Sequence, residues 1–139
     1  MTLKRKKPPK KKIRTIKSLK AQAWRLFSIW IRQKYAGKDG MSKCFTCGTV
    51  DHWKNLQAGH GISGRGNAIL FEDRVIRPQC YSCNIHKHGN YQVFIPKLIH
   101  EIGQDLYESL EKESHLPVKL SRGYYEELIQ ELKNLVVSE

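Results

Sequence analysis

The chain has little that would place it in a membrane or in an oxidising compartment. Its 139 residues contain no apolar run long enough to span a bilayer, and no apolar stretch of the kind found in signal peptides follows the charged N-terminus. We therefore expect a soluble, intracellular protein without a membrane partner. Internal repeats are also absent, and the length suits one domain with appended arms.

Cysteine is scarce, with four residues in the whole chain. In an intracellular protein, four cysteines are more often metal ligands than disulfides. Cys44, Cys47, Cys80 and Cys83 form two C-x2-C pairs that are separated by 32 residues. Two short loops that each carry two thiolates can surround one zinc ion tetrahedrally. The spacing therefore predicts one structural Zn²⁺ site, with disulfides, a redox pair or free thiols as the alternatives.

Acidic residues are missing from the first 38 positions, which carry 14 lysines and arginines. Residues 39–99 carry 7 basic and 4 acidic residues, whereas residues 100–139 carry 4 basic and 9 acidic ones. The net charge of +12 is thus concentrated at the N-terminal end, where it would attract polyanions. We expect this end to bind nucleic acid; a solubilising tail is the alternative.

Residues 1–17 are expected to form a disordered basic arm. The stretch KRKKPPKKK (4–12) has charges of one sign, two prolines and no apolar face, so it cannot fold alone. Arg65 in a glycine loop and Lys87 near the second cysteine pair could add phosphate contacts. The DNA contacts predicted in the arm are Lys4, Arg5, Lys6, Lys7, Lys10, Lys11, Lys12 and Arg14.

An amphipathic helix is predicted directly after the arm. Apolar residues recur at helical spacing from Ser18 to about Tyr35, and most of the basic residues lie off that stripe. Ser18 is the expected N-cap, and GKDG (37–40) is the expected stop. We therefore assign residues 18–40 to a basic amphipathic helix and a linker.

Helical periodicity returns at Pro96 and predicts C-terminal helices over residues 96–139. One apolar stripe runs to Leu110, HLPV (115–118) interrupts it, and a second helix follows Ser121. We expect this last helix to pack on the core, with packing against a second copy of the chain as the alternative.

Residues 41–95 hold every cysteine and are expected to form the folded core. CFTCG is typical of a tight knuckle, and Leu56–His60 and Ile69–Phe71 are predicted to pair as a hairpin around the loop SGRGN (63–67). A short helix is predicted to begin near Cys83. This order predicts an α+β fold with a small, zinc-stapled, treble-clef-like core and flanking helices.

A second constellation follows from that order. His60 ends the first predicted strand, Asn84 directly follows the last cysteine, and His88 would share a helix face with Asn84. A strand histidine that faces two helix ligands is the layout of a ββα-metal (HNH) nuclease centre. A neutral imidazole can act as general base there, and a hydrated divalent cation can activate the phosphodiester.

We interpret His60 as the catalytic base and Asn84 and His88 as ligands of Mg²⁺ or Mn²⁺. Each residue has a simpler alternative role. His60 could form a hydrogen bond within the hairpin, and Asn84 could cap the short helix. If the segment is not helical, His86 replaces His88 as the better candidate for a ligand.

These motifs also carry a family resemblance. The runs CFTCGT, QAGH, QCYSCNIHKHGN and LIHEIG resemble the phage lambda NinG (Rap) recombination-protein family. More distantly, they are similar to HNH nucleases with two zinc knuckles, including junction resolvases of the phage T4 endonuclease VII type. The resemblance covers residues 41–110 and implies a phage-encoded endonuclease for branched DNA such as Holliday junctions and D-loops.

The resemblance implies the same roles for His60, Asn84 and His88, but two positions depart from the HNH pattern. The residue before the base is usually an Asp or His that binds metal, and here it is Gly59. Gln57, on the same side of the strand, or a water could take its place. Val75 stands where the central asparagine of the motif is expected.

The sequence therefore predicts a metal-dependent, structure-specific DNA endonuclease in the cytoplasm of a bacterial host. Because symmetric resolution of a junction takes two active sites, we expect a homodimer. A non-catalytic zinc protein that binds DNA and supports recombination or replication is the main alternative. An RNA-binding zinc protein is a third possibility.

Overall fold

The structure is a computed structural model that describes residues 6–9, 13–63 and 66–137. The helices are α1 (Ile16–Lys34), α2 (Tyr91–Ile102), α3 (Gln104–Ser114) and α4 (Arg122–Leu135). The strands are β1 (Met41–Lys43), β2 (Val50–His52), β3 (Gln57–His60) and β4 (Ile76–Gln79). Short helical turns are η1 (Trp53–Asn55), η2 (Asp73–Val75) and the π-turn η3 (Ser82–His86). This mixture confirms the predicted α+β class.

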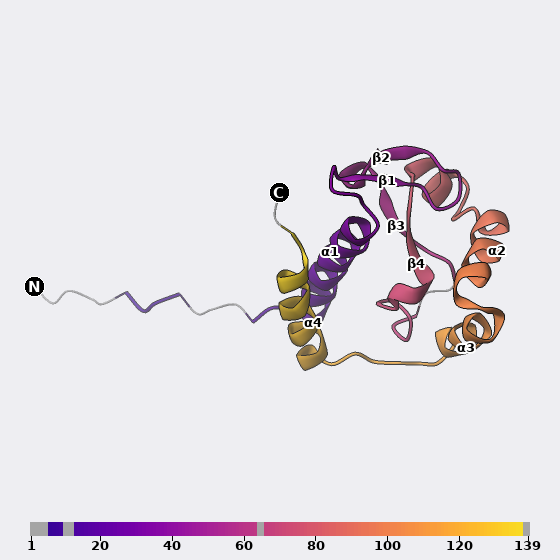
Figure 1. The fold of residues 1–139 in the computed structure, drawn as a ribbon. Coiled ribbons are helices and arrows are strands. Elements are labelled where there is room, and N and C mark those ends of the chain that lie inside the picture. Colours follow the sequence, from indigo (N-terminus) through magenta and orange to yellow (C-terminus); the bar gives the residue numbers. More distant parts are fainter. Residues whose placement is uncertain (1–5, 10–12, 64–65, 138–139) are drawn as a thin grey trace, which may run out of the picture.

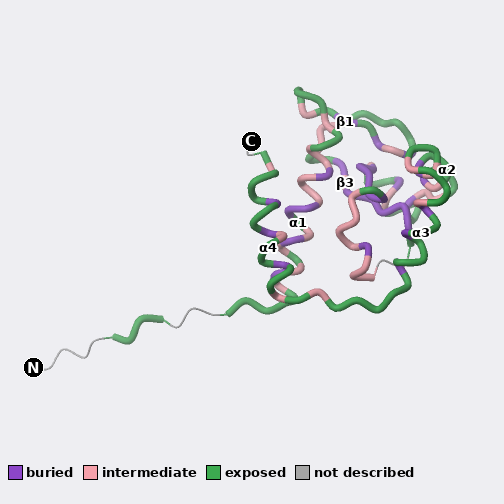
Figure 2. Tube along the Cα trace, turned by 60° about the horizontal axis from the view of Figure 1, so that its bottom comes forward, coloured by how far each residue is buried: buried purple, intermediate pink, exposed green. Residues whose placement is uncertain are grey.

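The β3–β4 hairpin lies in the middle of the molecule, between two pairs of helices, and β1 and β2 lie at one end of it, at the top of the view (Figure 1). Helices α1 and α4 lie side by side on one side of the β3–β4 hairpin, and α2 and α3 lie on the other. Residues 6–9, two lysines and two prolines, are exposed and lie away from the folded body (Figure 2). In the described part of the chain, no helix combines the length and the apolar character needed to cross a membrane.

Helix α1 begins three residues earlier than the predicted cap at Ser18 implies. Thr15 caps it, because its side-chain oxygen accepts a hydrogen bond from the backbone N–H of Ser18 at 3.1 Å. Ser18 therefore lies inside the first turn and is not the cap. Thr15 and Ser18 are both good capping residues, so the pattern alone could not separate them.

The apolar stripe of α1 is covered by α4, as expected for a last helix that packs on the core. Leu19 and Ala23 are buried in α1, and Tyr125, Ile129 and Leu132 are buried in α4. Helix α4 follows Ser121 as predicted, and Ser121 caps it, since its hydroxyl accepts from the backbone N–H of Tyr124 at 3.1 Å. The buried side of α4 is thus occupied within the chain.

The hairpin partner of β3 is β4, and the predicted strand Ile69–Phe71 was wrong. Gln57 pairs with Gln79 and His60 pairs with Ile76 in an antiparallel ladder. Residues 69–71 form turns in the connection between the strands. Their apolar side chains fill the core without pairing: Ile69 is fully buried, and Phe71 packs on Phe27 and Tyr125.

Helix α2 begins at Tyr91 and continues through Pro96, so the predicted start at residue 96 was five residues late. The apolar stripe that predicts one helix forms two helices, because Gly103, with φ 90°, separates α2 from α3. Helix α2 packs closely on the end of β3. A Cβ at Gly61 would lie 2.5 Å from Leu98 and 2.7 Å from Phe94, so this contact requires glycine.

Candidate functional site

The four cysteines come together as the spacing predicts. All four are free thiols, and their sulfur atoms lie within 4.8 Å of one another. The Sγ atoms of Cys47 and Cys80 are 3.7 Å apart. Tetrahedral zinc with Zn–S bonds of about 2.3 Å requires sulfur atoms about 3.8 Å apart. The geometry and the donor set therefore fit a structural Zn²⁺ held by Cys44, Cys47, Cys80 and Cys83.

The knuckle geometry comes from tight backbone turns. The N–H of Gly48 donates to the carbonyl of Cys44 at 2.9 Å, and Gly48 adopts φ 77°, which glycine tolerates best. Although burial opposes it, hydrogen bonds from Thr46 and from backbone groups lower the pKa of Cys44 to about 6. Burial raises the pKa of Cys80 to about 12. Cys44 therefore loses its proton more easily than Cys80 does.

Gln79 connects this cluster to the turn that follows it. Its Nε2 donates to the hydroxyl of Thr46 at 3.1 Å and to the carbonyl of Gly89 at 2.9 Å. The hydroxyl of Thr46 lies 3.4 Å from the sulfur of Cys44. A single buried carboxamide thus ties the first knuckle to the segment after the second, and nothing in the sequence pattern marks this role.

Asn84 lies in the π-turn η3, directly after the last cysteine. Its Nδ2 donates to Oε1 of Gln57 at 2.7 Å, which places it against the first residue of β3. This agrees with the prediction that Asn84 lies next to the strand of His60. Asn84 caps no helix, since η3 begins at Ser82 and its flanking residue is Tyr81.

His88 does not share a helix face with Asn84, contrary to the predicted short helix. The π-turn ends at His86, and His88 has φ 50° in the left-handed region. A turn that runs through Gly89 redirects the chain there, with the N–H of Gly89 bonded to the carbonyl of Cys83 at 3.0 Å. His86 and His88 are both exposed.

His60 is buried on the α1 side of the hairpin, with 3% of its surface exposed. Its ring stacks on Trp24, with centroids 5.0 Å apart and an interplanar angle of 21°. Its Nε2 lies 3.2 Å from the carbonyl oxygen of Leu70. Because side chains alternate along a strand, Gln57 and His60 point to opposite faces of β3. The structure therefore joins Asn84 to Gln57 but places His60 on the other face.

Gly59 has a steric explanation. Gln79 lies beside it on the paired strand, and a Cβ at position 59 would lie 1.9 Å from Oε1 of Gln79. Gln79 is completely buried. Among the described residues, its Oε1 is the one buried polar side-chain atom without a hydrogen-bond partner. The space in which an Asp or His would begin is thus filled from the opposite strand by a carboxamide.

The predicted DNA contacts are only partly within the structure. Lys4, Arg5, Lys10, Lys11, Lys12 and Arg65 lie outside the described residues. Lys6, Lys7 and Lys87 are exposed. Arg14 folds back onto the start of α1, where its guanidinium donates to Gln22 and to the hydroxyl of Ser18.

Two other arginines from basic stretches have structural roles. Arg32 donates to the carbonyl oxygens of Trp53 and Leu56, and burial lowers its pKa. Arg77 is buried in β4 and pairs with Glu101 of α2 at 2.9 Å. Their charge serves to join elements of the fold, which composition could not reveal.

The fold and the cysteine cluster define a class: a small α+β protein whose two knuckles are suited to one structural zinc ion. A family model described as "Bacteriophage Lambda NinG protein" matches residues 2–138. The chain therefore belongs to the NinG family, which confirms the resemblance seen in its motifs.

Curated relatives in several phages carry the name "Protein ninG". The one from Escherichia phage lambda is 27% identical over 121 residues, which cover 77% of this chain and 59% of that protein. The one from Salmonella phage P22 is 30% identical over 119 residues, covering 78% of this chain and 58% of that protein. The chain spans about three fifths of the length of these relatives. No solved structure matches the chain.

Proposed function

We propose that this chain is a metal-dependent DNA endonuclease that acts on branched recombination intermediates, such as Holliday junctions and D-loops, in the cytoplasm of a bacterial host. Membership of the NinG family supports it, together with the more distant resemblance to HNH nucleases. The observation that carries it is the contact of Asn84 with Gln57. This contact holds Asn84, the residue after the last cysteine, against β3, the strand that ends in His60.

The hydrogen bond of His60 to Leu70 fixes one nitrogen of its ring as a donor. The carbonyl of Leu70 can only accept, so Nε2 of the ring carries the proton in that contact. As the catalytic base, the imidazole would take a proton from the attacking water. The stacking on Trp24 holds the plane of the ring.

Asn84 would hold the catalytic cation, with Gln57 beside it; His88, predicted as the second ligand, does not share a helix face with Asn84. Since Nδ2 of Asn84 donates to Gln57, its Oδ1 is the oxygen that can face a cation. Carboxamide oxygens are hard donors that suit Mg²⁺ or Mn²⁺. When bound, that ion would polarise the scissile phosphate and stabilise the leaving oxygen.

The burial of His60 adds a requirement. With 3% of its surface exposed, and on the face of β3 opposite Gln57, the ring meets a phosphodiester only if the groups packed around it, Trp24 and Leu70 among them, move. DNA binding would have to supply the free energy for that movement. Cleavage should therefore depend on the strength of DNA binding as well as on the ring itself.

The distribution of charge gives DNA a direction of approach. The basic arm and the exposed Lys17 and Arg25 of α1 would contact flanking duplex. Helices α3 and α4 carry most of the acidic residues and would face away from DNA. Two copies would be needed to cut both strands of a junction. Because α1 covers the buried side of α4, the two copies would have to meet through other surfaces.

Cleavage of a labelled four-way junction in Mg²⁺ or Mn²⁺ tests this proposal. His60→Gln removes the basic nitrogen but keeps a donor for the carbonyl of Leu70, so we expect folded protein with at least about 100-fold slower cleavage. Asn84→Ala should raise the metal concentration that cleavage needs. His100→Gln, at an exposed histidine of α2, is the matched control and should cut normally. No cutting by the wild type in either metal sinks the nuclease proposal.

The second candidate is a non-catalytic zinc protein that binds branched DNA and supports recombination or replication. The burial of His60 on the face opposite Gln57 favours it, as does the uncharged pair Gly59 and Gln79. This candidate predicts tight binding to the junction in a gel-shift assay and intact DNA at every metal concentration. Wild-type cleavage that His60→Gln abolishes would exclude it.

A further inference from the structure

The turn that carries and follows the second pair of cysteines presents an apolar surface to solvent. Tyr81 is 52% exposed and Ile85 is 44% exposed. The neighbouring Cys83 is buried in the metal cluster. Exposed apolar side chains are common one at a time, but here two lie on one short turn.

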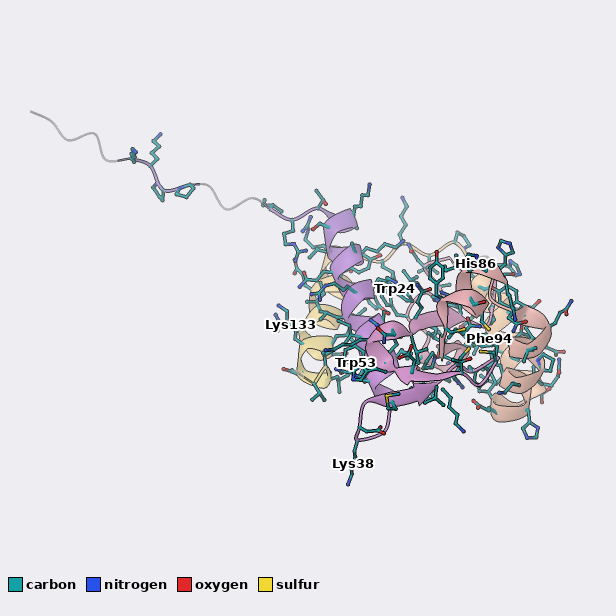
Figure 3. The ribbon with its side chains drawn as sticks, turned by 90° about the horizontal axis from the view of Figure 1, so that it is seen from above. Trp24, Lys38, Trp53, His86, Phe94 and Lys133 are labelled. Atoms are coloured by element: carbon teal, nitrogen blue, oxygen red, sulfur yellow. The ribbon has the colours of Figure 1, made fainter. Side chains whose placement is uncertain are left out.

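The π-turn explains how a second ring joins Tyr81. The N–H of Lys87 bonds to the carbonyl of Ser82 at 2.9 Å, which is the i to i+5 bond of a π-turn. This wider turn places the ring of His86 against Tyr81, with centroids 5.1 Å apart and planes at 79°. In Figure 3, His86 lies at the edge of the molecule, whereas Trp24 lies among the packed side chains. Single π-turns of this kind occur frequently at functional sites.

The surrounding charge favours an anionic partner. No Asp or Glu occurs between Asp73 and Glu101, a stretch that includes the whole turn. Lys87 and His88 follow the aromatic pair, and both are exposed. An exposed tyrosine elsewhere has the opposite setting: Tyr124 is 40% exposed on α4, a helix with three glutamates.

We propose that Tyr81 and His86 form a stacking surface for an unpaired nucleobase of DNA, with Lys87 on the adjoining phosphate. Aromatic side chains bind single-stranded nucleic acid because every base has a face on which they can stack. Bases in a continuous duplex are already stacked, so the surface gains most at a branch or fork. The choice of branched DNA rests on the proposed function; the stacking surface itself does not require cleavage.

The experiment uses the zinc-loaded full chain and a forked DNA that carries 2-aminopurine at an unpaired position next to the branch. Without added Mg²⁺ or Mn²⁺, binding is measured separately from cutting. Wild-type protein should quench the fluorophore. Tyr81→Ala should remove most of the quenching and weaken binding to the fork by about 5- to 100-fold. Tyr81→Trp should retain both, because it keeps an aromatic face.

Tyr124→Ala is the control, since it removes an exposed tyrosine from the acidic side and should leave fork binding unchanged. Zinc content and the thermal transition of each variant establish that the knuckle is intact. Equal losses on the fork and on a continuous duplex would overturn the proposal, because Tyr81 would then contact only the backbone. Unchanged binding by Tyr81→Ala would overturn it too. A wild type that shows the Tyr81 effect but cuts nothing would refute the nuclease and leave this inference standing.

Discussion

The close packing of the Gln79 side chain against Gly59 makes the sharpest prediction for the core. In Gly59→Ala, the new methyl group would lie 1.9 Å from Oε1 and 2.7 Å from Cδ of Gln79. Gln79 is completely buried and cannot swing into solvent. Its carboxamide must move, and the hydrogen bonds to Thr46 and to the carbonyl of Gly89 must stretch or break.

The expected cost follows from those contacts. Overpacking a buried site costs about 1–3 kcal/mol, and each buried group left without its partner costs about 1–3 kcal/mol more. Because the surrounding side chains can relax in part, we expect Gly59→Ala to lower the free energy of unfolding by about 2–4 kcal/mol. For a chain of this size, that corresponds to a decrease of roughly 10 °C in Tm.

Thermal denaturation followed by circular dichroism measures this loss, with zinc-loaded protein throughout. Gly123→Ala is the matched control, because a Cβ there meets only the hydroxyl of Ser121 at 3.9 Å and lies in a helix. It should leave Tm unchanged or raise it slightly. In the double variant with Gln79→Ala, the methyl group at position 59 has room, so the double variant should be no less stable than Gln79→Ala alone. Additive losses, or a wild-type Tm for Gly59→Ala, would refute the steric argument.

Other predictions concern the metal cluster, a buried ion pair and the packing of α4. Removing zinc with a chelator, or replacing Cys83 with Ser, should abolish the cooperative thermal transition, because structural zinc supplies folding free energy; an unchanged transition would exclude a structural metal. Arg77→Ala should cost about 3 kcal/mol or more in urea denaturation. Glu101→Ala leaves the buried guanidinium without its carboxylate but with its backbone acceptors, so it should cost less, about 1–3 kcal/mol. Leu132→Ala, at a buried position of α4, should lower the free energy of unfolding by about 2–5 kcal/mol, whereas exposed Leu135→Ala should lower it by under about 0.5 kcal/mol. Similar losses at the two positions would contradict the packing of α4 on α1.

The parts of the fold that the sequence predicted correctly depend on local chemistry. The spacing of Cys44, Cys47, Cys80 and Cys83 predicted their cluster, because two short loops leave few other ways to arrange four thiols. The break at HLPV and the apolar spacing after Ser121 predicted the start of α4. Such features act over a few residues, so a pattern in the sequence can show them.

The errors arose where tertiary contacts override a local pattern. Ile69–Phe71 has the apolar character of a strand, yet these side chains fill the core from a connection, and β4 pairs with β3 although it contains Pro78. The interval between Asn84 and His88 suggests a helix, but the π-turn and the turn at Gly89 separate them. The role of Gln79 could not be predicted without the register that sets it opposite Gln57.

The polar groups gathered on one face of β3 have a consequence for the proposed chemistry. Gln57, Gln79 and Asn84 are all carboxamides, and Gly59 replaces the carboxylate or imidazole of the HNH pattern. Neutral oxygens attract a divalent cation far less than a carboxylate does, because they contribute no net charge. The missing negative charge is available from DNA phosphate. Cation binding and DNA binding should therefore be coupled. The free protein should bind Mn²⁺ weakly, and branched DNA should raise its affinity for Mn²⁺. By linkage, Mn²⁺ should raise the affinity of the protein for branched DNA by the same factor.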